Sequence, residues 1–177
     1  MPRVGAAVLK ARYIRGLLMP YNLGNLAFGV AGRVGLVPID VPWPVIIDRI
    51  IYQVGTTSSG NVRAGIYREG ETADSAEGGA LVVESASVAQ LTATYIQMIT
   101  VADTILTPGR YFAGIQGSSA TGTFEGGIEA AGSVILYYDR AGGYGAFTDP
   151  CPTLGAYGYG AFIMLRVKEN LPAGYRL

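Results

Sequence analysis

The chain contains no histidine, and cysteine occurs once, as Cys151, among its 177 residues. The absence of histidine excludes an intrachain Ser-His-Asp or Cys-His catalytic arrangement and every metal site that needs a histidine ligand. A single cysteine excludes an intrachain disulfide and a cysteine-based zinc site. Stability must therefore come from packing. Between Pro150 and Pro152, Cys151 is predicted to be a small buried or turn residue, because its flanks supply nothing that would lower a thiol pKa.

Charge is scarce as well. Charged residues make up 15% of the chain, and 13 basic residues balance 13 acidic ones. Nucleic-acid binding needs clustered cations, whereas the local basic bias here is limited to four residues near the start. These are Arg3, Lys10, Arg12 and Arg15. They also interrupt the apolar start before a signal-peptide core or a membrane span could form. We therefore expect no nucleic-acid partner and no membrane span.

Hydrophobic residues, by contrast, make up half of the chain, and its 26 glycines are spread without a collagen-like period. This composition is typical of an all-β domain with many tight turns. Low charge with high apolar content also favours an oligomer, because large exposed apolar patches are uncommon on soluble monomers.

A periodic pattern starts near residue 34 and predicts strands at 34–42, 46–54 and 62–67, with a hairpin joining the last two across 56–61. Five further segments of strand length lie between Gly, Pro, Ser or Thr breaks: 80–88, 95–101, 110–116, 133–138 and 157–168. About eight strands at this spacing predict an antiparallel β-sandwich. We expect residues 34–177 to form this single domain and residues 1–33 to be an extended N-terminal arm that contacts a neighbouring subunit.

Two loops and one turn stand out between the strands. The acidic stretch 69–79 and the stretch 139–156 are expected to be exposed at one end of the sandwich. Pro108 and Gly109 predict a type II turn before a strand at Tyr111, because glycine tolerates the positive φ that this turn requires.

Catalytic and ligand-binding patterns are weak. Glu125, Glu129 and Asp139 could supply a carboxylate pair for glycoside hydrolysis, but nothing fixes their separation, and solvated loop acids are the favoured interpretation. The glycine-rich stretches 142–145 and 155–160 lack the lysine and the strand-loop-helix context of a phosphate site. We expect no enzymatic activity, no cofactor and no bound metal.

Aromatic residues give the best candidates for a contact site. Trp43, Tyr144 and Tyr157 lie beside proline or glycine in expected loops, where an aromatic ring can anchor an interface or stack on a sugar. For these three, a contact role and ordinary packing are both open. A carbohydrate-binding module would be favoured if their rings proved exposed and coplanar.

The order of several motifs resembles that of tailed-bacteriophage virion proteins, namely tail or head fibre and receptor-binding modules. The matching segments are 35–42 (GLVPIDVP), 47–50 (IDRI), 62–67 (VRAGIY) and 106–112 (LTPGRYF), within residues 33–116. The resemblance implies a jelly-roll-like sandwich on a virion, commonly a homotrimer, without enzymatic activity. It supplies no binding residues.

The sequence therefore predicts a noncatalytic bacteriophage virion protein (capsid decoration, tail or fibre component) that assembles with itself and with other virion proteins. The alternative is a β-sandwich module that binds a carbohydrate or a host receptor, such as a host-surface glycan. A small glycosidase, which would need two carboxylates facing each other in a cleft, with Glu125 as one candidate, is a further alternative. A membrane-surface protein, which would bind through residues 1–18, is another.

Overall fold

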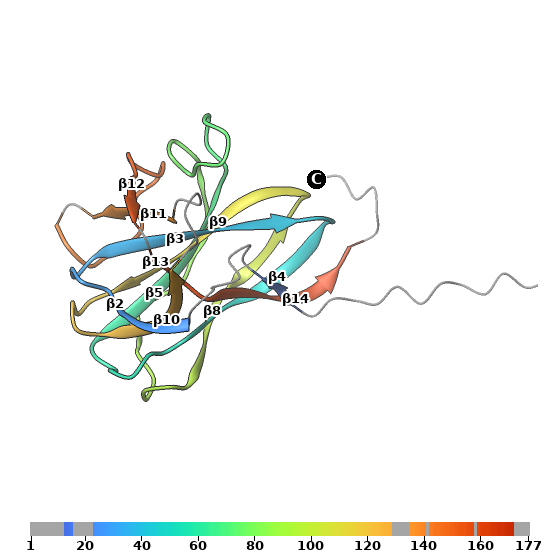
Figure 1. Cartoon of the computed structure of the whole chain (residues 1–177). Helices are drawn as coiled ribbons and strands as arrows, with labels where there is room; N and C mark the ends of the chain where they lie inside the picture. Colours follow the sequence, from blue (N-terminus) through green and yellow to red (C-terminus); the bar gives the residue numbers. More distant parts are fainter. Residues whose placement is uncertain (1–12, 16–22, 129–134, 141, 158, 172–177) are drawn as a thin grey trace, which may run out of the picture.

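A computed structural model of the chain describes residues 13–15, 23–128, 135–140, 142–157 and 159–171. Within these ranges the chain forms fourteen strands and no helix (Figure 1). The strands are β1 (Tyr13–Arg15), β2 (Leu23–Ala27), β3 (Arg33–Val41), β4 (Val45–Gln53), β5 (Asn61–Arg68), β6 (Leu81–Glu84), β7 (Val88–Ala89), β8 (Ile96–Leu106), β9 (Gly109–Gly117), β10 (Thr123–Ile128), β11 (Ile135–Asp139), β12 (Gly155–Tyr157), β13 (Tyr159–Ala161) and β14 (Ile163–Asn170).

The strands pair antiparallel in three sheets. A four-stranded sheet has the order β1-β14-β4-β8, and a three-stranded sheet has the order β13-β10-β2. The largest sheet has the order β12-β11-β3-β9-β5-β6, with β7 also paired to β5. A bridge between Val54 and Phe124 joins the two smaller sheets, so together they face the seven-stranded sheet.

The main core lies between these layers. Alternate residues of β3, β5 and β9, such as Ile39, Ile66 and Ile115, pack against Ile50 of β4 and Leu165 of β14, and all five are at most 1% exposed. Burial of these apolar side chains is the dominant stabilising contribution. The predicted all-β antiparallel sandwich is confirmed.

A second, smaller core covers the outer face of the seven-stranded sheet. Tyr67, Phe112 and Tyr138 project from this face and pack against Phe147 and Cys151 of the connection between β11 and β12. Strands β5 and β9 are therefore buried on both faces. Gly65 makes this possible, because a Cβ there would lie 2.5 Å from the ring of Phe147.

This second core corrects one prediction. The 139–156 stretch was expected to be an exposed loop, yet Phe147 and Cys151 are buried in it. The acidic loop 69–79 is exposed at residues 71–74, but its Ala76 is buried against the same cluster. Backbone hydrogen bonds from Gly78 and to Gly79 tie this loop to Cys151.

The strands predicted at 34–42, 46–54 and 62–67 are confirmed as β3, β4 and β5, but the predicted hairpin is wrong. Strand β4 pairs with β14 and β8, whereas β5 pairs with β9, β6 and β7. Residues 54–60 therefore cross between the layers. This arrangement buries both faces of β5, which a β4–β5 hairpin at the edge of one sheet would not do.

The predicted N-terminal arm, residues 1–33, includes two strands of the sheets. β1 pairs with β14 and β2 pairs with β10. Ile14 of β1 is buried in the main core. Residues 1–12 and 16–22 lie outside the described residues, so contact of the arm with a neighbour remains a prediction.

Candidate functional site

The three aromatic residues predicted as contacts lie in different places. Trp43 lies in the turn between β3 and β4, is 38% exposed, and donates a 2.8 Å hydrogen bond from Nε1 to Oδ1 of Asn170. The turn that contains Tyr144 lies at the other end of β3, because Gly143 contacts Gly32 there. The two ends of β3 are separated by nine residues of strand, which span a distance of about 30 Å. Trp43 and Tyr144 therefore do not form one platform.

Tyr144 is half-buried and bound to its own domain. Its hydroxyl lies 2.7 Å from the hydroxyl of Ser87, and the guanidinium of Arg63 lies 6.0 Å from its ring centroid. The backbone of Tyr157 ends β12, and its side chain is outside the described part of the structure. A contact role for each of the three residues remains a prediction.

Two of the three carboxylates predicted as catalytic candidates, Glu125 and Asp139, lie in the described part of the structure, and both belong to strands. Asp139 accepts two hydrogen bonds from Arg33, at 2.7 and 2.9 Å, and these lower the pKa of its carboxyl. A lowered pKa is the opposite of what a general acid needs at neutral pH. Glu125 lies on β10 opposite Asn25, and Glu129 is outside the described residues.

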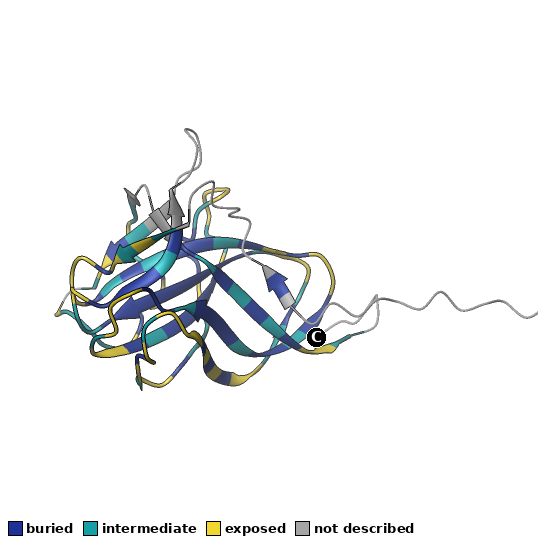
Figure 2. Cartoon of the chain, turned by 60° about the horizontal axis from the view of Figure 1, so that its bottom comes forward, coloured by how far each residue is buried: buried dark blue, intermediate teal, exposed yellow. Residues whose placement is uncertain are grey.

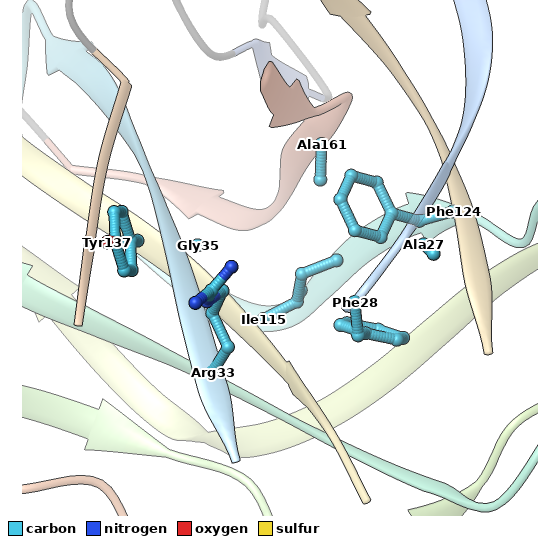
Figure 3. Close-up of a pocket in the computed structure, with 8 residues that line it drawn as sticks. All are labelled: Ala27, Phe28, Arg33, Gly35, Ile115, Phe124, Tyr137 and Ala161. Carbon is cyan, nitrogen blue, oxygen red and sulfur yellow. The ribbon is translucent and has the colours of Figure 1, made fainter. Parts of the chain in front are cut away.

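A small apolar pocket lies between β3 and β10, lined by Phe28, Phe124, Ile115 and Ala161, with Arg33 and Tyr137 on one side (Figure 3). The guanidinium of Arg33 lies 4.5 Å from the ring centroid of Tyr137. The pocket has room for about one water molecule. It is too small to hold a sugar ring. Within the described ranges, no group of three or more acidic or cysteine side chains is placed to hold a metal ion.

One end of the sandwich is built from loops that themselves contain no charged residue, although Arg33 and Arg140 lie beside the loop at 28–32. Four stretches without Lys, Arg, Asp or Glu contribute to it: residues 23–32, 50–62, 85–102 and 111–124. Their loops, 28–32, 54–60, 90–95 and 117–122, are joined to one another and to the start of β10 by backbone hydrogen bonds. Gly29 donates to Ala120, Thr94 donates to Gly55, and Gln90 donates to Gly60. We call these four loops, together with the adjoining start of β8, the uncharged end.

Buried polar groups hold the loops of the uncharged end together. The side chain of Gln90 is buried and bridges two of them, accepting from the backbone amide of Ser59 at 2.8 Å and donating to the carbonyl of Thr123 at 2.8 Å. The Thr123 hydroxyl in turn accepts from the amide of Thr57. Satisfied buried polar groups of this kind make a loop arrangement rigid.

Large exposed hydrophobic side chains gather at the uncharged end. Among the described residues, six large hydrophobic side chains are exposed, and five of these belong to the uncharged stretches. They are Tyr95 (62% exposed), Ile96 (56%), Met98 (53%), Leu91 (45%) and Val30 (44%). Elsewhere the strands are mostly buried or intermediate, as Figure 2 shows. An exposed apolar surface with few charges and with aromatic and methionine side chains is typical of a protein interface.

Sequence reasoning missed this surface. The strand at 95–101 was predicted, but the sequence pattern did not indicate which face of that strand is exposed to solvent. The usable signal was the run of 18 residues without charge, 85–102, which is long for a strand and its adjoining loop on a protein surface.

No family model, curated protein or solved structure matches the chain. The described residues contain no helix long and apolar enough to cross a membrane.

Proposed function

We propose that this chain is a noncatalytic structural protein of a bacteriophage virion, a capsid decoration, tail or fibre component that assembles as a symmetric oligomer. The uncharged end carries the assembly part of the proposal. Five of the exposed large hydrophobic side chains gather there without a charged residue among them. Surfaces of this composition are stable in water when another protein surface covers them.

The virion setting is supported by the order of the motifs within residues 33–116, which resembles that of phage tail, fibre and receptor-binding modules. The jelly-roll connectivity that the resemblance implies belongs to the same proposal. Two observations agree with a noncatalytic role. Asp139 is held by two hydrogen bonds from Arg33, and the pocket beside Arg33 has room for about one water molecule.

Labelling of virions tests the proposal. Antibodies raised against the purified chain are applied, with gold detection, to intact particles from a culture that carries the gene, and antibodies pre-absorbed with the chain serve as the control. We expect gold at symmetric positions on the particles and peptides of the chain in digests of purified particles. Absence of the chain from purified particles would contradict the proposal.

A glycan-binding module is the second candidate, and the exposure of Tyr95 favours it. The Tyr95 ring is 62% exposed, and the Thr94–Gly55 hydrogen bond places it beside the hydroxyl-rich loop at 56–59. A glycan array tests this candidate with the parent and with Tyr95→Ala, Trp43→Ala and Tyr144→Ala. Binding by the parent that is lost in one of these variants would support it, and no binding by the parent would exclude it for the glycans present.

A further inference from the structure

Strand β8 differs from every other edge strand that the structure describes. Six of the seven described edge strands are short: β7 has two residues, β1, β12 and β13 have three each, β6 has four and β2 has five. β8 has eleven residues and pairs with β4 alone among the described strands. Proteins limit unwanted strand pairing by keeping edge strands short. β8 lacks this protection.

Charge, proline and glycine are absent from the first part of β8, between Ile96 and Ala102, and the irregularity in its pairing with β4 comes only after Thr100. The first charge is Asp103, which forms an ion pair with Lys168. Side chains alternate along this stretch, with Gln97, Ile99 and Val101 buried and Ile96 and Met98 exposed on the outward face.

We infer that two copies of this chain pair through β8, antiparallel about a twofold axis, so that their four-stranded sheets become one continuous sheet. This deepens the proposed function, because it rests on the symmetric assembly proposed there. Ile96 and Met98 then gain cross-strand neighbours on the outward face. The turn with Leu91 and Tyr95 then lies against the later part of β8 in the other copy.

A second copy fits this edge better than another partner because of charge and length. A charged partner side chain would lose its hydration against the Ile96–Ala102 stretch of β8, and Arg49, which lies diagonal to Met98 on the same face, is already paired with Asp48. The matching element is β8 itself, whose uncharged part, Ile96–Ala102, is hydrogen-bonded to no described strand other than β4. Antiparallel pairing of identical strands is self-complementary about a twofold axis. The assembly therefore contains an even number of chains, a dimer or, combined with a threefold contact, a hexamer.

Charge insertion on β8 tests the inference. Met98→Glu places a carboxylate from each copy in the paired edge. The fold should tolerate this substitution, because Met98 is opposite Ile51 in the β4–β8 pairing and diagonal to Arg49 on the same face, where the new carboxylate can interact with the guanidinium. Thr72→Glu is the matched control: it adds the same charge at an exposed residue of the 69–79 loop, outside both β8 and the uncharged end. We expect at least about a 100-fold weaker association for Met98→Glu, and little change for Thr72→Glu.

Cross-linking gives a second, independent measurement. The one native cysteine, Cys151, is 2% exposed, so Met98→Cys adds a thiol that a short bis-maleimide can reach while Cys151 stays protected. We expect covalent dimers of Met98→Cys and none of the parent, with thermal melting to show that each variant is folded.

The outcomes separate this inference from the proposed function. A trimer, or any assembly that Met98→Glu leaves intact and Met98→Cys does not cross-link, would overturn pairing through β8 while leaving self-assembly standing. A parent that stays monomeric at every concentration would overturn both. An even-numbered assembly that Met98→Glu dissociates supports the inference.

Discussion

The hydroxyls of Tyr67 and Tyr138 lie 2.7 Å apart in the second core, although 71 residues separate them in the chain. Tyr67 donates onward to the carbonyl of Thr148 at 2.6 Å, so the hydrogen between the tyrosines comes from Tyr138. The ring of Tyr67 also stacks on Phe147, with 6.1 Å between centroids. This chain of hydrogen bonds fixes the 142–154 segment on the outer face of the seven-stranded sheet.

Because the Tyr138 hydroxyl donates to Tyr67 and the Tyr67 hydroxyl donates to Thr148, removing the two hydroxyls should lower the free energy of unfolding by unequal amounts. Tyr67→Phe leaves both the Thr148 carbonyl and the Tyr138 hydroxyl without this buried partner, so we expect a loss of about 2 to 3 kcal/mol in the free energy of unfolding. Tyr138→Phe preserves the bond from Tyr67 to the Thr148 carbonyl and removes the longer bond, 3.4 Å, that the Tyr138 hydroxyl accepts from the Thr148 amide, so it should cost about 1 kcal/mol. Urea unfolding of both variants and of the double variant measures these values. Equal losses in the two single variants would contradict the assigned hydrogen-bond direction.

Cys151 should be inert in the folded protein. Burial raises the pKa of its thiol to about 12, with a smaller contribution from the carboxylate of Glu77. Since the thiolate is the reactive form, the folded chain should not react with a thiol reagent at pH 7 to 8, and one thiol per chain should react in denaturant. Absorbance with Ellman's reagent measures this. Rapid labelling under native conditions would show that the second core opens readily.

Asp48 should contribute a pH-dependent part of the stability. It is buried beside a β-bulge and accepts a 2.7 Å hydrogen bond from Nε of Arg166, and this bond is the main cause of its lowered pKa. Because the folded-state pKa lies below the unfolded value, the stabilisation is present above about pH 4 and is lost as the pH falls through the folded-state pKa. Asp48→Asn should therefore cost about 2 kcal/mol at pH 7 and progressively less in acid.

Thermal melts of the parent and of Asp48→Asn between pH 7 and pH 2 test this dependence. The exposed pair of Asp103 and Lys168 provides the matched control, since Asp103→Asn removes a surface ion pair and should cost less than about 1 kcal/mol. A difference between the parent and Asp48→Asn that grows in acid would contradict the assignment.

Gly109 should tolerate no side chain without cost. We expected a type II turn here, but its φ of +152° differs from the value near +80° that such a turn requires. The Tyr111 hydroxyl closes this turn, accepting from the amide of Thr107 at 3.1 Å and donating to its carbonyl at 3.0 Å. Gly109→Val should destabilise the domain by about 1 to 3 kcal/mol through backbone strain alone, because nothing lies within 4 Å of a Cβ there. Melting of the variant within error of the parent would refute this.

The sequence predicted the long strands well and the short ones poorly. Alternation over eight or nine residues marks β3, β4 and β5 clearly, whereas β1, β12 and β13 have three residues each, too few for any period. Strand β10 was missed because its Gly126 and Gly127 read as loop residues. They pair instead with Gly24 and Leu23 of β2, and with Ala161 and Gly160 of β13.

The sequence did not predict which strands pair with each other or which strand faces are exposed to solvent. The β4–β5 hairpin was expected because short connections usually join neighbouring strands, but the need to bury both faces of β5 decides the pairing with β9. The candidate site was missed for a related reason. Exposure of Met98 beside buried Ile99 depends on which of the described segments pack on each face of β8, and alternation alone does not reveal this.

The central claim, that the chain assembles through an uncharged surface, is tested most directly by its mass in solution at low and high salt. Salt screens interactions between charges but not apolar burial, so sedimentation equilibrium at 0.05 M and 1 M salt distinguishes the two kinds of interface. We predict an even multiple of 18.6 kDa at both salt concentrations. A monomer in both conditions, or an assembly that dissociates in high salt, would contradict the claim.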